Sequence, residues 1–91
     1  MSAKPDLVSL RGEVQTVFRR VFADDAIVIA DTMTAADIDG WDSLGHINLI
    51  IAVEKQFKIT FATAEISRLK ADGQNIGTFL LLIQDKVGAR K

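Results

Sequence analysis

The sequence predicts an all-α fold, a small four-helix bundle in which three helices are longer and one is short. Three stretches repeat apolar residues at intervals of three and four, which is the spacing of one helix face. One run, residues 58–61, alternates in polarity, but it has no second run to pair with, so we expect a packed connection there. The chain has 91 residues and is 48% hydrophobic, which suits one small globular domain.

We expect a single domain over residues 1–91, with residues 1–5 and 88–91 flexible. The sequence contains no cysteine, which excludes disulfides and thiolate metal sites. Its formal net charge of −1 gives no reason to expect nucleic-acid binding. No apolar run resembles a signal peptide or is long enough to span a membrane, so we expect a cytoplasmic protein.

The first helix is expected from Asp6, which can cap it, to about Phe22. The arginines at positions 11, 19 and 20 fall on the opposite side from the apolar stripe. We interpret them as a solvated helix face rather than as a basic surface for a partner. The stripe itself consists of Leu7, Leu10, Val14, Val17, Phe18, Val21 and Phe22.

A long ordered loop is expected over residues 23–41, with one short turn near Thr34–Asp37. Its aspartates do not form a calcium loop, because Gly40 comes too early and no glutamate follows at the required spacing. We therefore expect no metal site and interpret the aspartates as negative charge around the approach to Ser43. The apolar residues that should hold the loop against the bundle are Ile27, Ile29, Met33 and Ile38.

The second helix is expected to begin at Asp42 or Ser43, either of which can cap it, and to run to about Phe57. Ser43 would then lie at a helix N-terminus, where N–H groups and the macrodipole favour an anion. The residues alone leave two roles open for Ser43, a helix cap and an attachment point for a phosphate ester. The apolar positions of this helix are Leu44, Ile47, Ile50, Ile51, Val53 and Phe57.

A short third helix is expected over about Thr63–Leu69, followed by a turn and a fourth helix capped by Asn75. The inward stripe of the fourth helix is expected to be Ile76, Phe79, Leu80, Ile83 and Val87.

No catalytic constellation can be assembled from this sequence. His46, the single histidine, lies off the stripe formed by Leu44, Ile47 and Ile51, so we expect it to be exposed. A histidine close to a serine in sequence does not provide the geometry of a catalytic triad. We therefore expect a protein that is not an enzyme.

The motif Asp42-Ser43-Leu44 resembles the Asp-Ser-Leu motif of acyl carrier proteins, and the similarity continues through Glu54–Ile59 and covers nearly the whole chain. The resemblance implies an acyl-carrier-like bundle whose Ser43 carries covalent 4′-phosphopantetheine. A separate phosphopantetheinyl transferase would attach this group and supply the catalysis.

The resemblance also implies sites for partners and for cargo. The second helix has more apolar positions than one inward face needs, so we expect some to be exposed and to dock partner enzymes. Gly45, Asn48 and Lys55 stand where the family often has acidic residues, which favours a specialised pathway over general fatty-acid enzymes. The implied docking residues are Asp42, Leu44, Ile47, Ile51 and Glu54, and the implied acyl-pocket residues are Ile47, Ile51, Phe61, Ile66 and Leu69.

The resulting hypothesis is a free-standing, monomeric acyl carrier protein that holds acyl thioesters in a fatty-acid, polyketide or specialised lipid pathway. Its partners would be the transferase and the enzymes that load and process the acyl group. A peptidyl or aminoacyl carrier would use the same serine chemistry, and an unmodified helical interaction module is a further alternative.

Overall fold

The structure is a computed structural model that describes residues 6–68 and 74–89, without the side chain of residue 68. The described residues contain helices and no strand, which confirms the predicted all-α bundle. Among them, no helix is long and apolar enough to cross a membrane. In chain order the elements are α1 (Leu7–Val21), the 3₁₀ helix η1 (Ala35–Asp37), α2 (Ser43–Phe57), α3 (Thr63–Arg68) and α4 (Ile76–Ala89).

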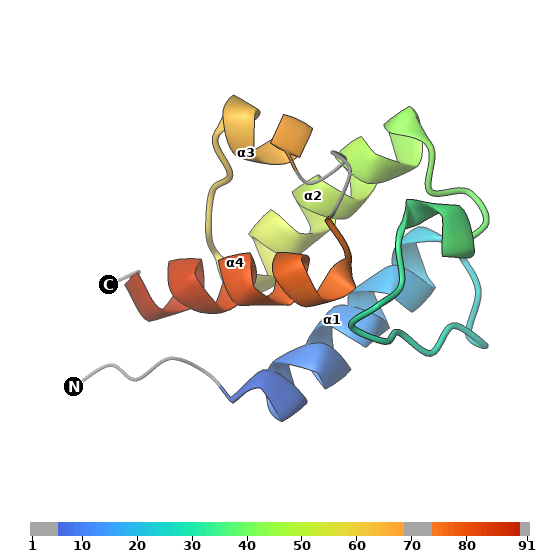
Figure 1. The fold of residues 1–91 in the computed structure, drawn as a ribbon, viewed down its shortest axis with the longest axis horizontal. Helices are drawn as coiled ribbons and strands as arrows, with labels where there is room; N and C mark the ends of the chain where they lie inside the picture. Colours follow the sequence, from blue (N-terminus) through green and yellow to red (C-terminus); the bar gives the residue numbers. More distant parts are fainter. Residues whose placement is uncertain (1–5, 69–73, 90–91) are drawn as a thin grey trace.

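The three longer helices enclose the core. Helix α1 contacts both α2 and α4, and the short α3 lies on the side of the bundle away from α1 (Figure 1). The buried hydrophobic residues come from every longer helix, from the loop before α2 and from the connection after it. They are Leu10, Val14, Val17, Phe18, Ile29, Ile38, Leu49, Ile50, Val53, Phe57, Ile59, Phe61, Ile76, Phe79, Leu80 and Ile83.

Helix α1 begins where the sequence predicts. The Asp6 carboxylate accepts a hydrogen bond from the Val8 N–H at 3.2 Å, so Asp6 is the N-cap. The helix ends at Val21, and the backbone then turns through Ala23 at φ 52°, in the left-handed region. The expected inward face is buried at Leu10, Val14, Val17 and Phe18.

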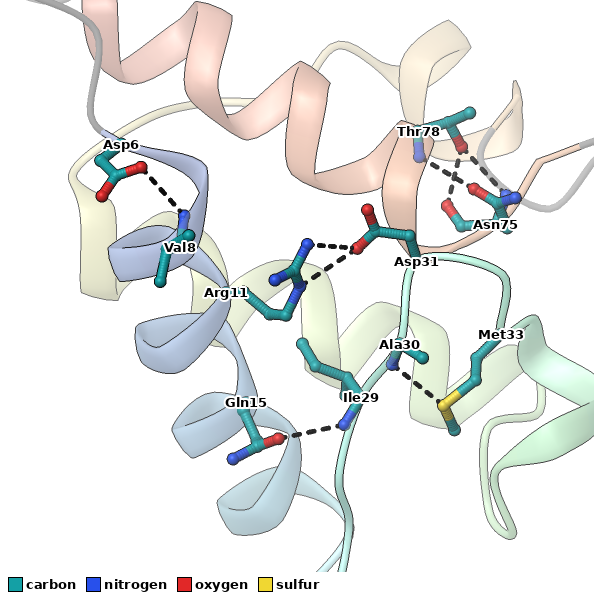
Figure 2. A network of polar contacts seen from close by, with 10 residues as sticks. All are labelled: Asp6, Val8, Arg11, Gln15, Ile29, Ala30, Asp31, Met33, Asn75 and Thr78. Carbon is teal, nitrogen blue, oxygen red and sulfur yellow. Dashed lines mark hydrogen bonds and ion pairs between the residues drawn. The ribbon is translucent and has the colours of Figure 1, made fainter.

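The loop before α2 is fixed to the face of α1 that we expected to be solvated. Arg11 donates two hydrogen bonds to one oxygen of Asp31, at 3.1 and 2.8 Å, and the Gln15 side chain accepts from the Ile29 N–H (Figure 2). Further along, Arg19 donates to the carbonyl oxygen of Ile27 at 2.7 Å. The expectation of a merely solvated face is therefore wrong for Arg11 and Arg19, because their guanidinium groups bind a loop that is distant in sequence.

The same loop also covers the start of α4. Ile76 and Gly77 begin the helix, so their N–H groups have no acceptor within it. They donate instead to the carbonyls of Met33 and Asp31, at 2.8 and 2.9 Å. The predicted cap Asn75 accepts from the Thr78 N–H at 3.0 Å (Figure 2). These contacts join the loop and α4 into one structural unit.

The remaining boundaries differ little from expectation. Helix α2 ends at Phe57, after which Lys58 takes a left-handed conformation at φ 56°, and the connection buries Ile59 and Phe61 without forming a strand. Helix α3 begins at Thr63 as predicted, whereas the predicted end at Leu69 lies outside the described residues. Residues 88 and 89, expected to be flexible, are the last helical residues of α4.

Candidate functional site

Ser43 is the first residue of α2 and is exposed. The structure decides which side chain caps the helix: the Asp42 carboxylate accepts from the Gly45 N–H at 2.8 Å. The Asp42 carbonyl accepts from the His46 N–H, also at 2.8 Å, and closes the first turn. Ser43 is therefore an exposed residue at a well-fixed helix start, close to the positive end of the helix dipole.

The segment leading to Ser43 folds tightly over this first turn. Gly40 has φ 88°, a left-handed conformation that glycine adopts without steric cost. The Trp41 ring packs edge-on against Phe18 of α1, with ring centroids 5.2 Å apart, and lies 6.2 Å from the ring of Phe22. The serine is thus preceded by a residue anchored in the aromatic core.

His46 is buried, with 2% of its surface exposed, so the expectation that it is exposed is wrong. Its Nδ1 lies 3.0 Å from the Trp41 Nε1, and its Nε2 lies 3.1 Å from the carbonyl oxygen of Ile66 in α3. The error came from the choice of face: the stripe of Leu44 and Ile47 points outward, not inward. The sequence did contain a signal for the burial of His46. Position 46 lies three, four and seven residues before Leu49, Ile50 and Val53, which is the spacing of one helix face, and these three residues are buried.

The apolar residues predicted to dock partners do lie on the surface. Leu44, Ile47 and Ile51 are 68%, 51% and 44% exposed and form a stripe along the outer face of α2. Beside Ile51 an open groove runs toward α1, and it carries two basic side chains, Arg20 and Lys55. The other residues of the groove are Asn48, Ala52 and Gln56.

Glu54, the acidic residue expected in the docking surface, also has a structural contact. One carboxylate oxygen accepts from the Phe61 N–H at 2.8 Å. This bond satisfies a backbone donor on a residue that is itself buried. Glu54 is half-buried as a result and holds the connection between α2 and α3 against the helix.

The residues expected to line an acyl pocket are only partly brought together. Phe61 is buried with its ring 6.0 Å from that of Phe79, and Ile66 is half-buried. Ile47 and Ile51 are exposed on α2, and Leu69 lies outside the described residues. The small cavity of this region lies between the loop, His46 and the start of α4, and its lining residues are Thr34, Ala35, Trp41, His46, Gln74, Asn75 and Phe79.

Several loop aspartates hold the structure together through polar contacts. Asp31 pairs with Arg11, Asp37 forms a capping box with Thr34, and Asp24 accepts from the Ala26 N–H at 2.9 Å. In residues 6–68 and 74–89 no three acidic, histidine or cysteine side chains are grouped so that they could hold a metal ion. Negative charge beside Ser43 comes from its neighbour Asp42.

One comparison with known proteins, that with solved structures, agrees with this architecture. Neither the models of protein families nor the curated proteins give a match. Among solved structures, the chain is similar to a holo acyl carrier protein from Geobacter metallireducens, with a TM-score of 0.74 and 41% sequence identity. The similarity covers 91% of this chain and 86% of the other. At this identity and coverage, the chain belongs to the acyl carrier protein family.

Proposed function

We propose that this protein carries acyl groups as thioesters on 4′-phosphopantetheine attached to Ser43, and that it is not itself an enzyme. The observation that carries the proposal is an exposed serine at the first position of α2, within Asp42-Ser43-Leu44, in a chain 41% identical to a holo acyl carrier protein. The prosthetic group would supply the thiol that a chain without cysteine lacks.

The residues present suit this group. A phosphodiester on the exposed Ser43 would stay in water, and its negative charge would lie at the positive end of the α2 dipole. One oxygen of Asp42 accepts the Gly45 N–H, so the neighbouring carboxylate is held on the helix start. The protein's own contribution is to present the hydroxyl on a rigid support while the arm moves between partner enzymes at high effective concentration.

For docking we propose the outer surface of α2, with Asp42, Leu44, Ile47, Ile51 and Glu54 as its contact residues. The exposed apolar stripe supports this, because three large aliphatic side chains on one face favour contact with an apolar partner surface. The first partner would be the phosphopantetheinyl transferase, followed by the enzymes that load and process the acyl group.

The charge on this surface favours partners outside the general fatty-acid pathway. The one acidic side chain within α2 is Glu54, and it is engaged with the Phe61 N–H. Arg20 and Lys55 border the groove beside Ile51. Electrostatic steering depends on charges of opposite sign on the two surfaces, so a strongly basic partner surface would gain little here. We therefore propose a specialised lipid or polyketide pathway.

The test is intact-mass analysis after incubation with coenzyme A and a broad-specificity phosphopantetheinyl transferase. We expect the addition of one phosphopantetheine to the wild type and none to Ser43→Ala. Ser9→Ala and Ser67→Ala are matched controls, because both serines are exposed on helices. Addition that persists in Ser43→Ala, or no addition with several transferases, would overturn the proposal.

A second assay separates the two kinds of carrier. The holo protein is offered acyl donors with an acyl-loading enzyme and amino acids with an adenylating enzyme. We expect a thioester from the acyl donors alone. Loading with amino acids alone would show that the protein is an aminoacyl or peptidyl carrier and not an acyl carrier. The proposed modification site would stay the same.

A further inference from the structure

His46 is a buried titratable side chain to which the carrier role gives no function. Its two ring nitrogens face two different segments: Nδ1 is 3.0 Å from the indole Nε1 of Trp41, and Nε2 is 3.1 Å from the carbonyl oxygen of Ile66. An indole nitrogen is a donor only, and a carbonyl oxygen is an acceptor only. The ring must therefore be neutral, with Nδ1 accepting from Trp41 and the proton on Nε2 donated to Ile66.

The two segments held by this ring have different places in the fold. Trp41 lies two residues before Ser43 and is packed in the aromatic core against Phe18. Ile66 belongs to α3, a helix of six residues that is too short to be stable without tertiary contacts. Helix α3 is also joined to α4 by the ion pair between Glu65 and Lys86, at 2.7 Å.

We propose that His46 is a positioning residue that ties α3 to the Trp41–Ser43 segment through its neutral, Nε2-protonated ring. A displacement of α3 would then be transmitted through the His46 ring to Trp41, which lies two residues before Ser43. A role of this link in binding cargo or partners rests on the proposed carrier function. The two hydrogen bonds of His46 do not depend on that function.

Protonation of the ring breaks one end of the tie and keeps the other. A second proton makes Nδ1 a donor, so it can no longer accept from Trp41, while Nε2–H still donates to Ile66. The neutral ring is therefore the form that keeps both hydrogen bonds.

Two variants separate the ends of the tie. In His46→Asn, the side-chain oxygen takes the place of Nδ1, so the Trp41 bond is kept and the Ile66 bond is lost. In His46→Gln, the longer side chain places its amide near the position of Nε2, so the Ile66 bond is kept and the Trp41 bond is lost. Each variant is the matched control for the other.

The readout is hydrogen exchange by NMR in the unmodified protein. The Trp41 Nε1–H reports one hydrogen bond, and the Ile66 N–H, which donates to the carbonyl of Ala62 just before α3, reports the other. We expect Ile66 to exchange about tenfold faster in His46→Asn with Trp41 within twofold of wild type, and the reverse in His46→Gln. The Ser43 amide shift should change more in His46→Gln.

The wild type gives a test that does not depend on either variant folding. At about pH 8 the ring nitrogens should have the ¹⁵N pattern of the Nε2–H tautomer. When the pH is lowered until the ring nitrogens show the ¹⁵N pattern of the protonated ring, the Trp41 Nε1–H should lose protection and the Ile66 N–H should keep it. The Nδ1–H tautomer, or a Trp41 resonance that does not respond to protonation of the ring, would overturn the proposal. Because no phosphopantetheine is involved, that failure is distinct from a failure of Ser43 modification.

Discussion

The carbonyl oxygen of Gly40 lies against the Cα of Gly45, in the space that a Cβ on residue 45 would occupy. The same position is 3.1 Å from the ring of Phe22. The backbone before Ser43 can therefore fold back over the first turn of α2 only because residue 45 has no side chain. The N–H of the same residue donates to the capping carboxylate of Asp42 at 2.8 Å.

Gly45→Ala should lower the free energy of unfolding by about 1–3 kcal/mol, because the added methyl group overlaps backbone that cannot move aside cheaply. Gly12→Ala is the matched control, since a Cβ there meets nothing within 4 Å. That variant should gain up to about 1 kcal/mol from helix propensity. Urea unfolding followed by Trp41 fluorescence measures both. Equal stability of the two variants would contradict the close approach.

Leu44→Ala should impair function more than stability. Leu44 is 68% exposed, so its truncation should change the free energy of unfolding by less than about 1 kcal/mol, while the rate of Ser43 modification falls. Leu49→Ala, on the buried face of the same helix, should cost about 2–5 kcal/mol. Thermal unfolding and transferase kinetics on both variants make the comparison. A Leu44 variant that is modified at the wild-type rate would remove this residue from the docking surface.

Two substitutions at Glu54 separate its charge from its hydrogen bond. Glu54→Gln keeps an oxygen that can accept the Phe61 N–H and should leave stability within about 0.5 kcal/mol. Glu54→Ala leaves that buried donor without this acceptor and should cost about 1–3 kcal/mol. If the carboxylate also steers partners, Glu54→Gln should slow modification at low salt, with the difference fading as salt is added. Identical kinetics at every salt concentration would limit Glu54 to its structural role.

A medium-length acyl chain should raise the melting temperature of the holo protein. An acyl chain left in water exposes apolar surface, and burying that surface gains a free energy of about 25 cal/mol per Å². Entry of the chain between α2 and α3 is therefore favourable once the short α3 moves. NMR shift changes should then concentrate at Ile47, Ile51, Phe61, Ile66 and Leu69. Equal melting temperatures, with changes confined to the surroundings of Ser43, would indicate that the arm stays outside and that the cargo is short or polar.

The sequence by itself determined the helices and the candidate attachment serine. Caps such as Asp6 and Asn75 act on N–H groups two or three residues away, and an apolar stripe repeats within a single helix, so both signals are local. Ser43 could be singled out because its neighbours and the helix after it form a recognisable motif. The local pattern of α2, however, contained two apolar faces and did not decide which of them is buried.

Only the tertiary structure decided which of those faces is buried. Both faces carry leucine or isoleucine, and the packing of α1 against α2 leaves Leu44 outside and places Leu49 inside. The same holds for His46, whose ring binds a carbonyl 20 residues away, and for Arg11, whose partner Asp31 is equally distant in sequence. Hydrogen bonds between distant segments depend on how the chain folds back on itself, and they impose no periodicity from which they could be predicted.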